Sequence, residues 1–113
     1  MVPAKLVLAS IAAVSAMALW TGEAAASDNR VATGKKLVKA NCSRCHAVGP
    51  AGDSPHPPAP PFRTLHARYP VEDLAEALVE GIFVGHTKMP RFVFTPEQAD
   101  DIIAYLKTLE PQN

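Results

Sequence analysis

The sequence predicts an all-α fold, because apolar residues recur at helical spacing in three segments and no segment alternates them as a strand would. Residues that favour helix ends flank these segments. Ser27 or Asp28 is placed to cap the first segment, Gly81 follows the second, and Thr95 precedes the third. The chain is therefore expected to run helix, loop, helix, loop, helix.

The first predicted helix leads directly into Asn41. Val31, Gly34 and Val38 recur on one of its faces, and Leu37 lies beside them. A glycine in the interior of a helix costs about 1 kcal/mol relative to alanine. Gly34 therefore needs a packing reason.

The middle helix is predicted from a clean amphipathic pattern that ends at Gly81. Its apolar face consists of Val71, Leu74, Ala75, Leu78, Val79 and Ile82. Its solvent face carries Glu72, Asp73, Glu76 and Glu80.

The last helix has a complete start signal. Thr95 stands at the N-cap, Pro96 at the first helical position and Gln98 three residues after the cap, which together form a capping box. Pro111 stops the helix. Its expected buried stripe consists of Ala99, Ile102, Ile103 and Leu106.

Residues 42 to 46 read Cys-Ser-Arg-Cys-His, the attachment pattern for a c-type haem. Two thiols three positions apart can each form a thioether with one of the two vinyl groups of a haem. His46 then follows as the proximal ligand of the iron. Cys42 and Cys45 are the only cysteines in the chain, so no other thiol competes for them.

Two other readings of this pattern are weaker. A thioredoxin-type redox pair expects a βαβ context, which the sequence lacks. A structural zinc site needs four Cys or His ligands at local spacings. Only His56, His66 and His86 remain to complete such a site, and they are scattered.

The N-terminus has the pattern of a secretory signal peptide. Lys5 is followed by an almost continuous apolar run from Leu6 to Trp20, and Ala24-Ala25-Ala26 is a cleavage site. The run is shorter than the roughly 18 residues that a membrane span needs, so an uncleaved anchor is the lesser alternative. We expect residues 1–26 to be a signal peptide, cleavage after Ala26, and no stable membrane span in the mature chain. Export also suits the chemistry, because haem is attached to such thiols outside the cytoplasm.

Cleavage leaves residues 27–113 as one small domain. A chain this short buries little apolar surface and usually needs a disulfide, a metal or a bound cofactor to stabilise it. A covalently held haem would supply that stabilisation. The apoprotein is therefore expected to fold poorly. A Pro-rich segment from Gly49 to Pro61 is expected to wrap one edge of the haem, because a flexible linker there would leave no core on either side.

The chain resembles a class I c-type cytochrome, a small soluble monohaem protein, over residues 28 to 110. Four features carry the resemblance: the run from Cys42 to His46, Met89-Pro90, Gly34 eight residues before Cys42, and Ile102 to Lys107 in the last helix. The resemblance implies three main helices around a covalent haem, with residues 27–113 as the cytochrome c domain. It also implies that the first and last helices cross closely at Gly34.

The resemblance implies that Met89 is the distal ligand of the iron, opposite His46. A single methionine usually fills a core, but Met89 lies in a polar loop and precedes a proline. A thioether is a soft, weak ligand that stabilises reduced iron and raises the potential. His86 is the rival ligand, and His56 and His66 stay as lesser ones.

The resemblance also implies a carbonyl acceptor for the ring N–H of His46, which raises the basicity of the ligand. The segment Ala59-Pro60-Pro61-Phe62 matches the family at this point, so Pro60 is the expected acceptor and Phe62 packs on the haem. The mature chain would lack tryptophan, which many relatives use to hold a haem propionate. The candidate replacements are Arg63, His66, Arg68 and Tyr69.

Charge is divided unequally along the chain although the whole chain has a formal net charge of +0. Residues 27–70 hold seven Lys or Arg and two Asp, a net +5, and residues 71–113 hold three Lys or Arg and eight acids, a net −5. Solvated helix faces explain this equally well as a dipole that directs the haem edge toward an acidic partner. Nucleic-acid binding is not indicated.

These features predict a periplasmic monohaem electron-transport protein that carries one electron between a redox donor and a redox acceptor. Ligation by both His46 and Met89 would leave no open iron site, so we expect no enzymatic activity. Two alternatives stay open: a haem subunit of a periplasmic dehydrogenase complex, and a haem sensor or peroxidase in which Met89 is labile. The protein is expected to be a monomer or a subunit of a redox complex.

Overall fold

The computed structural model describes residues 21–81 and 89–112. Within those ranges every regular element is a helix, so the all-α prediction is confirmed. In chain order the elements are α1 (Thr21–Cys42), the 3₁₀ helices η1 (Phe62–Ala67) and η2 (Val71–Asp73), α2 (Leu74–Glu80) and α3 (Pro96–Thr108).

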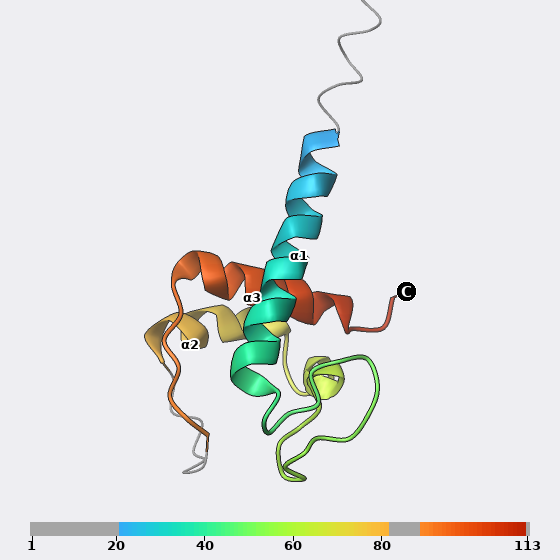
Figure 1. Cartoon of the computed structure of the whole chain (residues 1–113), viewed down its shortest axis with the longest axis vertical. Coiled ribbons are helices and arrows are strands. Elements are labelled where there is room, and N and C mark those ends of the chain that lie inside the picture. Colours follow the sequence, from blue (N-terminus) through green and yellow to red (C-terminus); the bar gives the residue numbers. More distant parts are fainter. Residues whose placement is uncertain (1–20, 82–88, 113) are drawn as a thin grey trace, which may run out of the picture.

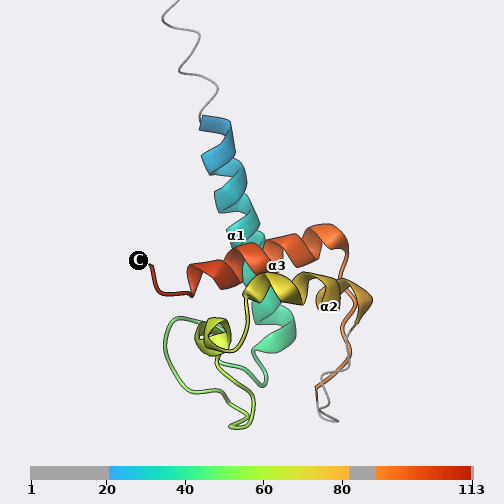
Figure 2. The same cartoon turned by 180° about the vertical axis from the view of Figure 1, so that it is seen from behind.

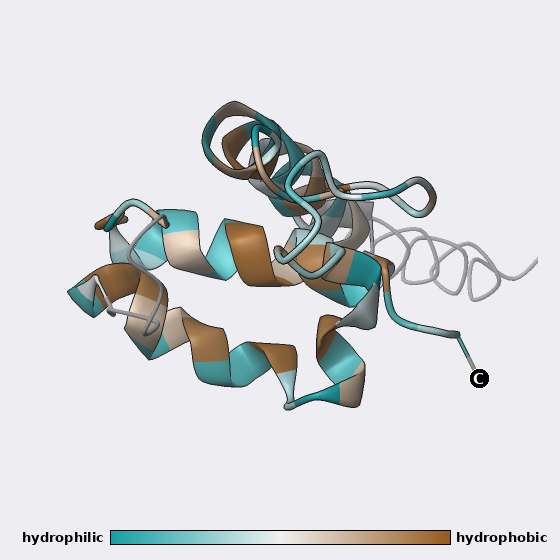
Figure 3. Cartoon of the chain, turned by 90° about the horizontal axis from the view of Figure 1, so that it is seen from below, coloured by the Kyte–Doolittle hydropathy of each residue, from teal (hydrophilic) through white to brown (hydrophobic). Residues whose placement is uncertain are grey.

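Helix α3 is the centre of the molecule. It packs against α1 on one side and against α2 on the other. Figures 1 and 2 show α1 crossing α3, and the view from below places α3 between the other two helices (Figure 3). Helices α1 and α2 therefore lie on opposite faces of the described part of the chain.

The crossing of α1 and α3 depends on Gly34. A Cβ atom at this position would overlap the backbone carbonyl of Asp101 and contact the Cβ of Tyr105. Val38, one turn further on, is 1% exposed against α3. The close approach of α1 and α3 thus explains the glycine inside the helix, since any side chain at position 34 would hold the two backbones apart.

Helix α1 begins earlier than the sequence pattern indicates. It starts at Thr21, so Ser27 and Asp28 lie inside the helix, and the expected cap at these residues is wrong for the full chain. The cause is local, because Ala24, Ala25 and Ala26 are the strongest helix formers and extend the helix backwards. Residues 22–30 are exposed and project away from the body (Figure 1).

The middle helix ends where the sequence predicts but starts with a tighter turn. Residues 71–73 form η2, and α2 follows from Leu74. Gly81 closes it in the left-handed conformation with φ 75°, and its N–H donates to the Ala77 carbonyl at 2.9 Å. The predicted apolar residue Ile82 lies outside the described residues.

The predicted capping box of α3 is confirmed. The Gln98 backbone N–H donates to Thr95 Oγ1 at 3.2 Å, and the Thr95 N–H donates to Gln98 Oε1 at 3.0 Å. The helix ends at Thr108, three residues before Pro111. All four residues of the predicted stripe are buried, and Tyr105 joins them.

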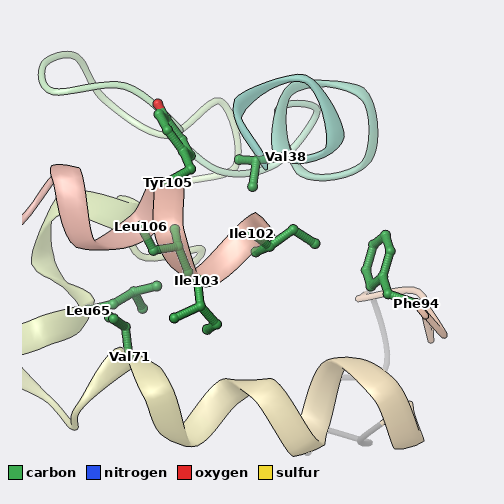
Figure 4. Close-up of a cluster of buried hydrophobic side chains, with 8 residues drawn as sticks. All are labelled: Val38, Leu65, Val71, Phe94, Ile102, Ile103, Tyr105 and Leu106. Carbon is green, nitrogen blue, oxygen red and sulfur yellow. The ribbon is translucent and has the colours of Figure 1, made fainter. Parts of the chain in front are cut away.

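The buried cluster draws on α1, η1, η2, α3 and the segment before α3 (Figure 4), and Leu74, Ala75 and Leu78 of α2 pack against it. Three of its contributors were not predicted, one of them Tyr105 of α3. Leu65 comes from η1, a 3₁₀ helix too short to show a period in the sequence, and Phe94 comes from the extended segment before α3. The buried cluster consists of Val38, Leu65, Val71, Phe94, Ile102, Ile103, Tyr105 and Leu106.

Across residues 21–81 and 89–112, no helix combines the length and the apolar character that crossing a membrane requires.

Candidate haem-attachment site

The end of α1 folds into a turn that gathers the three residues of the motif. The backbone N–H groups of Cys45 and His46 both donate to the Cys42 carbonyl, at 3.2 Å and 3.0 Å. Side chains satisfy the preceding helix carbonyls: Asn41 Nδ2 donates to Leu37 O at 2.8 Å, and Ser43 Oγ donates to Lys39 O at 2.5 Å. These side chains supply donors to carbonyl groups near the end of the helix, and the added hydrogen bonds stabilise its final turn.

Both thiols are free and half-buried, with no disulfide between them. Cys42 packs against the hydrophobic core. Burial raises the pKa of the Cys42 thiol to about 11, because the thiolate is poorly solvated there. The thiol is therefore protonated at neutral pH.

His46 is oriented by a backbone carbonyl. Its Nδ1 lies 2.8 Å from the carbonyl oxygen of Pro60. A carbonyl can only accept, so Nδ1 carries the proton, and in the neutral ring the lone pair is then on Nε2. The ring centroid of Phe62 lies 4.7 Å from that of His46, with the planes tilted by 40°.

The Pro-rich loop folds back on the motif and is no solvated linker. The His56 N–H donates to Cys45 O at 3.1 Å, and the Phe62 N–H donates to Ala47 O at 2.9 Å. These bonds tie the middle and the C-terminal end of the loop to the residues around His46. They bring Pro60 and Phe62 to the imidazole, 14 and 16 residues further along the chain.

Three polar side chains brace this loop, and the sequence reasoning assigned none of them to that task. Ser54 Oγ accepts from the Ala47 N–H at 3.0 Å, and Arg63 donates to Gly52 O at 2.6 Å. Tyr105 donates its hydroxyl proton to Val48 O at 2.6 Å, which connects α3 to the loop. A signal existed for Tyr105 alone, because it lies three residues after the predicted core residue Ile102.

Met89 lies apart from this group. It is 41% exposed and begins the segment 89–95 that leads to α3. That segment and the Pro-rich loop lie on opposite sides of the lower end of α1 (Figure 1). The rival ligand His86 lies outside the described residues.

The other candidate residues are scattered over the surface. His56 is half-buried in the Pro-rich loop. His66, Arg68 and Tyr69 are exposed, and they line a groove with Glu110 and Pro111, which follow α3. None of the motif residues lines this groove. Of the four candidates for a haem propionate, Arg63 alone is bonded into the loop beside the motif.

The chemistry of these groups fits covalent haem attachment. Two free thiols and an imidazole with one unprotonated ring nitrogen share a single turn, and an aromatic ring covers the imidazole. Within the part of the chain that the structure describes, no three His, Cys, Asp or Glu residues gather in a way that could hold a metal ion. A tetrahedral zinc site would need such a group.

Comparison with known proteins gives one match. Searches of curated proteins and of solved structures found none. The family model described as "Cytochrome c" matches residues 31–110, which include the haem motif, the Pro-rich loop, Met89 and α3. The match covers well over half of the 113 residues. Sequence motif, helical fold and family model therefore agree, and the chain belongs to the cytochrome c family.

Proposed function

We propose that this protein carries single electrons between redox partners in the periplasm, with His46 and Met89 as the axial ligands of its haem iron. Its family supports the coarser statement, a haem-based role in electron transfer. Family membership also implies a covalent haem c, for which Cys42 and Cys45 have the required spacing. The observation that carries the proposal is the 2.8 Å contact between His46 Nδ1 and Pro60 O, because it leaves Nε2 available as a ligand.

Each residue of the site has a separate task in this proposal. The bound haem would supply an iron that alternates between two oxidation states. Cys42 and Cys45 hold the group by thioether bonds. The Pro60 carbonyl fixes the tautomer of His46 and makes its ring a stronger base, while Phe62 limits the access of water to the imidazole.

Met89 is the proposed distal ligand. It precedes a proline at the start of an exposed segment, where no core packing accounts for it. A weak thioether ligand favours reduced iron. Ligation on both sides leaves no position for a substrate, so we propose a carrier and no enzymatic activity.

The proposed signal peptide agrees with the packing of α1. Residues 22–30 are all exposed, so the described residues 22–26 contribute nothing to the core that cleavage after Ala26 would remove. We propose that residues 1–26 are removed on export and that residues 27–113 form the working cytochrome c domain.

The near-infrared charge-transfer band of ferric Met-ligated haem tests the distal ligand. We expect the band in the wild-type protein and in His86→Ala, and its loss in Met89→Ala. Rapid binding of carbon monoxide to the reduced protein should likewise appear only in Met89→Ala. A band that survives Met89→Ala, or one lost in His86→Ala, would assign the ligand to another residue.

A further inference from the structure

The order of the helices converts a division of charge along the sequence into two opposite faces. Helix α3 separates α1 from α2 (Figure 3). The lysines of α1 and the glutamates of α2 therefore lie on different sides of α3. This arrangement depends on the tertiary structure, since α2 packed on the outer side of α1 would have mixed the charges.

The first face is the outer side of α1, here named the basic face, formed by Lys35, Lys36 and Lys39. All three residues are exposed. Gly34 and Val38 face α3. Helical geometry directs Lys36 to the opposite side and sets Lys35 and Lys39 together along one flank of α1. Their long aliphatic stems can cover apolar surface while the ammonium groups stay in water.

The second face contains a groove between α2 and the start of α3, here named the acidic groove. Its rim carries three exposed carboxylates, Glu76, Glu80 and Asp100. Arg91 donates to the Glu80 carbonyl, and Lys107 is paired with Glu72 of η2, which lies outside the groove. The groove is lined by the apolar residues Ala75, Val79, Pro96 and Ala99.

The two faces match each other in spacing as well as in sign. Lys35 and Lys39 are four residues apart on α1, and Glu76 and Glu80 are four residues apart on α2. One helical turn separates each pair, about 6 Å along the axis. Lysine stems lying along the apolar groove would set both ammonium groups against both carboxylates.

We propose that the acidic groove of one molecule binds the basic face of a second copy of this chain. The two surfaces consist of different residues on different helices, so the contact is head-to-tail. Such a contact repeats from molecule to molecule and produces an open chain, or a ring where the rotation closes. This inference does not rest on the proposed electron-transfer role.

Ionic strength determines the strength of such a contact. The screening length is about 30 Å at 0.01 M salt and about 3 Å at 1 M. Exposed charges on two molecules therefore attract each other at low salt and hardly at all at high salt. We expect weak association at 0.01 M salt and monomers at 1 M.

Sedimentation equilibrium of the haem-loaded protein tests the proposal. At 0.01 M salt the weight-average mass should rise steadily with concentration and pass twice the monomer mass. Two variants reverse one face each, Lys35→Glu with Lys39→Glu and Glu76→Lys with Glu80→Lys. Each alone should weaken association at least tenfold. An equimolar mixture of the two should associate again, because the reversed faces match.

The fourfold variant that combines all these changes keeps the net charge of the wild type and should self-associate like it. The matched control, Arg68→Glu with Glu110→Lys, also keeps the net charge, and it alters two charges that belong to neither face. It should leave association unchanged. A wild-type protein that stays monomeric at 0.01 M salt, a mass that stops at two copies, or a mixture that fails to associate would each overturn the proposal.

Discussion

Tyr105 shows how much one side chain contributes to the site without touching the haem motif. Its ring lies in the core, and its hydroxyl points out of the cluster toward the loop after the motif (Figure 4). There it donates to Val48 O at 2.6 Å. The residue therefore fixes the distance between α3 and the segment that follows His46.

Replacement of Tyr105 by phenylalanine should destabilise the protein by about 1 kcal/mol, because the Val48 carbonyl loses its donor while the ring stays in place. Urea denaturation of the haem-loaded protein measures this loss. Tyr69→Phe is the matched control, since Tyr69 is 36% exposed and its replacement should change little. An equal effect from both variants would refute the role given to the Tyr105 hydroxyl.

The same variant makes a prediction about alkaline pH. Burial raises the pKa of the Tyr105 phenol above its usual value of 10.0. Above pH 10 the unfolded chain releases this proton more readily than the folded one, so the free energy of unfolding falls as pH rises. Wild-type protein should therefore lose more stability between pH 9 and pH 11 than Tyr105→Phe does. Parallel curves for the two proteins would contradict the prediction.

His46 and Pro60 mark the limit of prediction at this scale. The sequence motif identifies His46 because the ligand directly follows the second thiol. The match of residues 59–62 to the family suggests Pro60, although the loop contains several prolines. The 2.8 Å contact selects Pro60, because the bonds of His56 and Phe62 to the residues on either side of His46 set the register of the loop.

Among the elements, the crossing of α1 and α3 is the most constrained. The Asp101 carbonyl lies where a side chain at position 34 would begin. Protein interiors are packed as densely as crystals. An atom added between backbones this close would therefore push the two helices apart.

Gly34→Ala should therefore destabilise the fold, although the same change at an exposed helix position would stabilise it by about 1 kcal/mol. We expect a loss of roughly 1–3 kcal/mol, as for other overpacked sites, measured by thermal or urea unfolding. Gly49→Ala is the control, since a Cβ there meets nothing within 4 Å. A Gly34→Ala protein as stable as the wild type would show that the helices can move apart without cost.

Helices α2 and α3 were predictable because their signals are local. Capping residues, a left-handed glycine and a 3.6-residue period all act within one or two turns. Two features were not predictable in this way. The start of α1 follows from the helix propensity of Ala24–Ala26 and not from a cap, and η1 is a 3₁₀ helix without a readable period.

For the whole molecule, the small core has consequences for stability. Its buried cluster consists of eight residues, and Cys42, Val48 and Phe62 around the motif are only partly buried. A domain of this size buries too little apolar surface to be robust. A covalent haem would add apolar contacts at the side where these residues are open.

The haem-free variant Cys42→Ala with Cys45→Ala should accordingly be poorly folded. Circular dichroism is expected to show reduced helix content and a broad melt, whereas the haem-loaded protein melts cooperatively. A haem-free protein with a cooperative, native-like melt would show that the helices alone support the fold.

The sequence by itself determined the helical class, the C-terminal end of α2, the capping box of α3 and the haem motif, since these depend on residues that are neighbours along the chain. The tertiary structure decided what joins distant residues. It selected Pro60 as the partner of His46, 14 residues away, and tied Tyr105 to Val48 across 57 residues. It also placed α3 between α1 and α2, which separates the basic face from the acidic groove. Such residues are far apart in the sequence and meet only when the chain folds. A pattern among neighbouring residues therefore does not predict their contact.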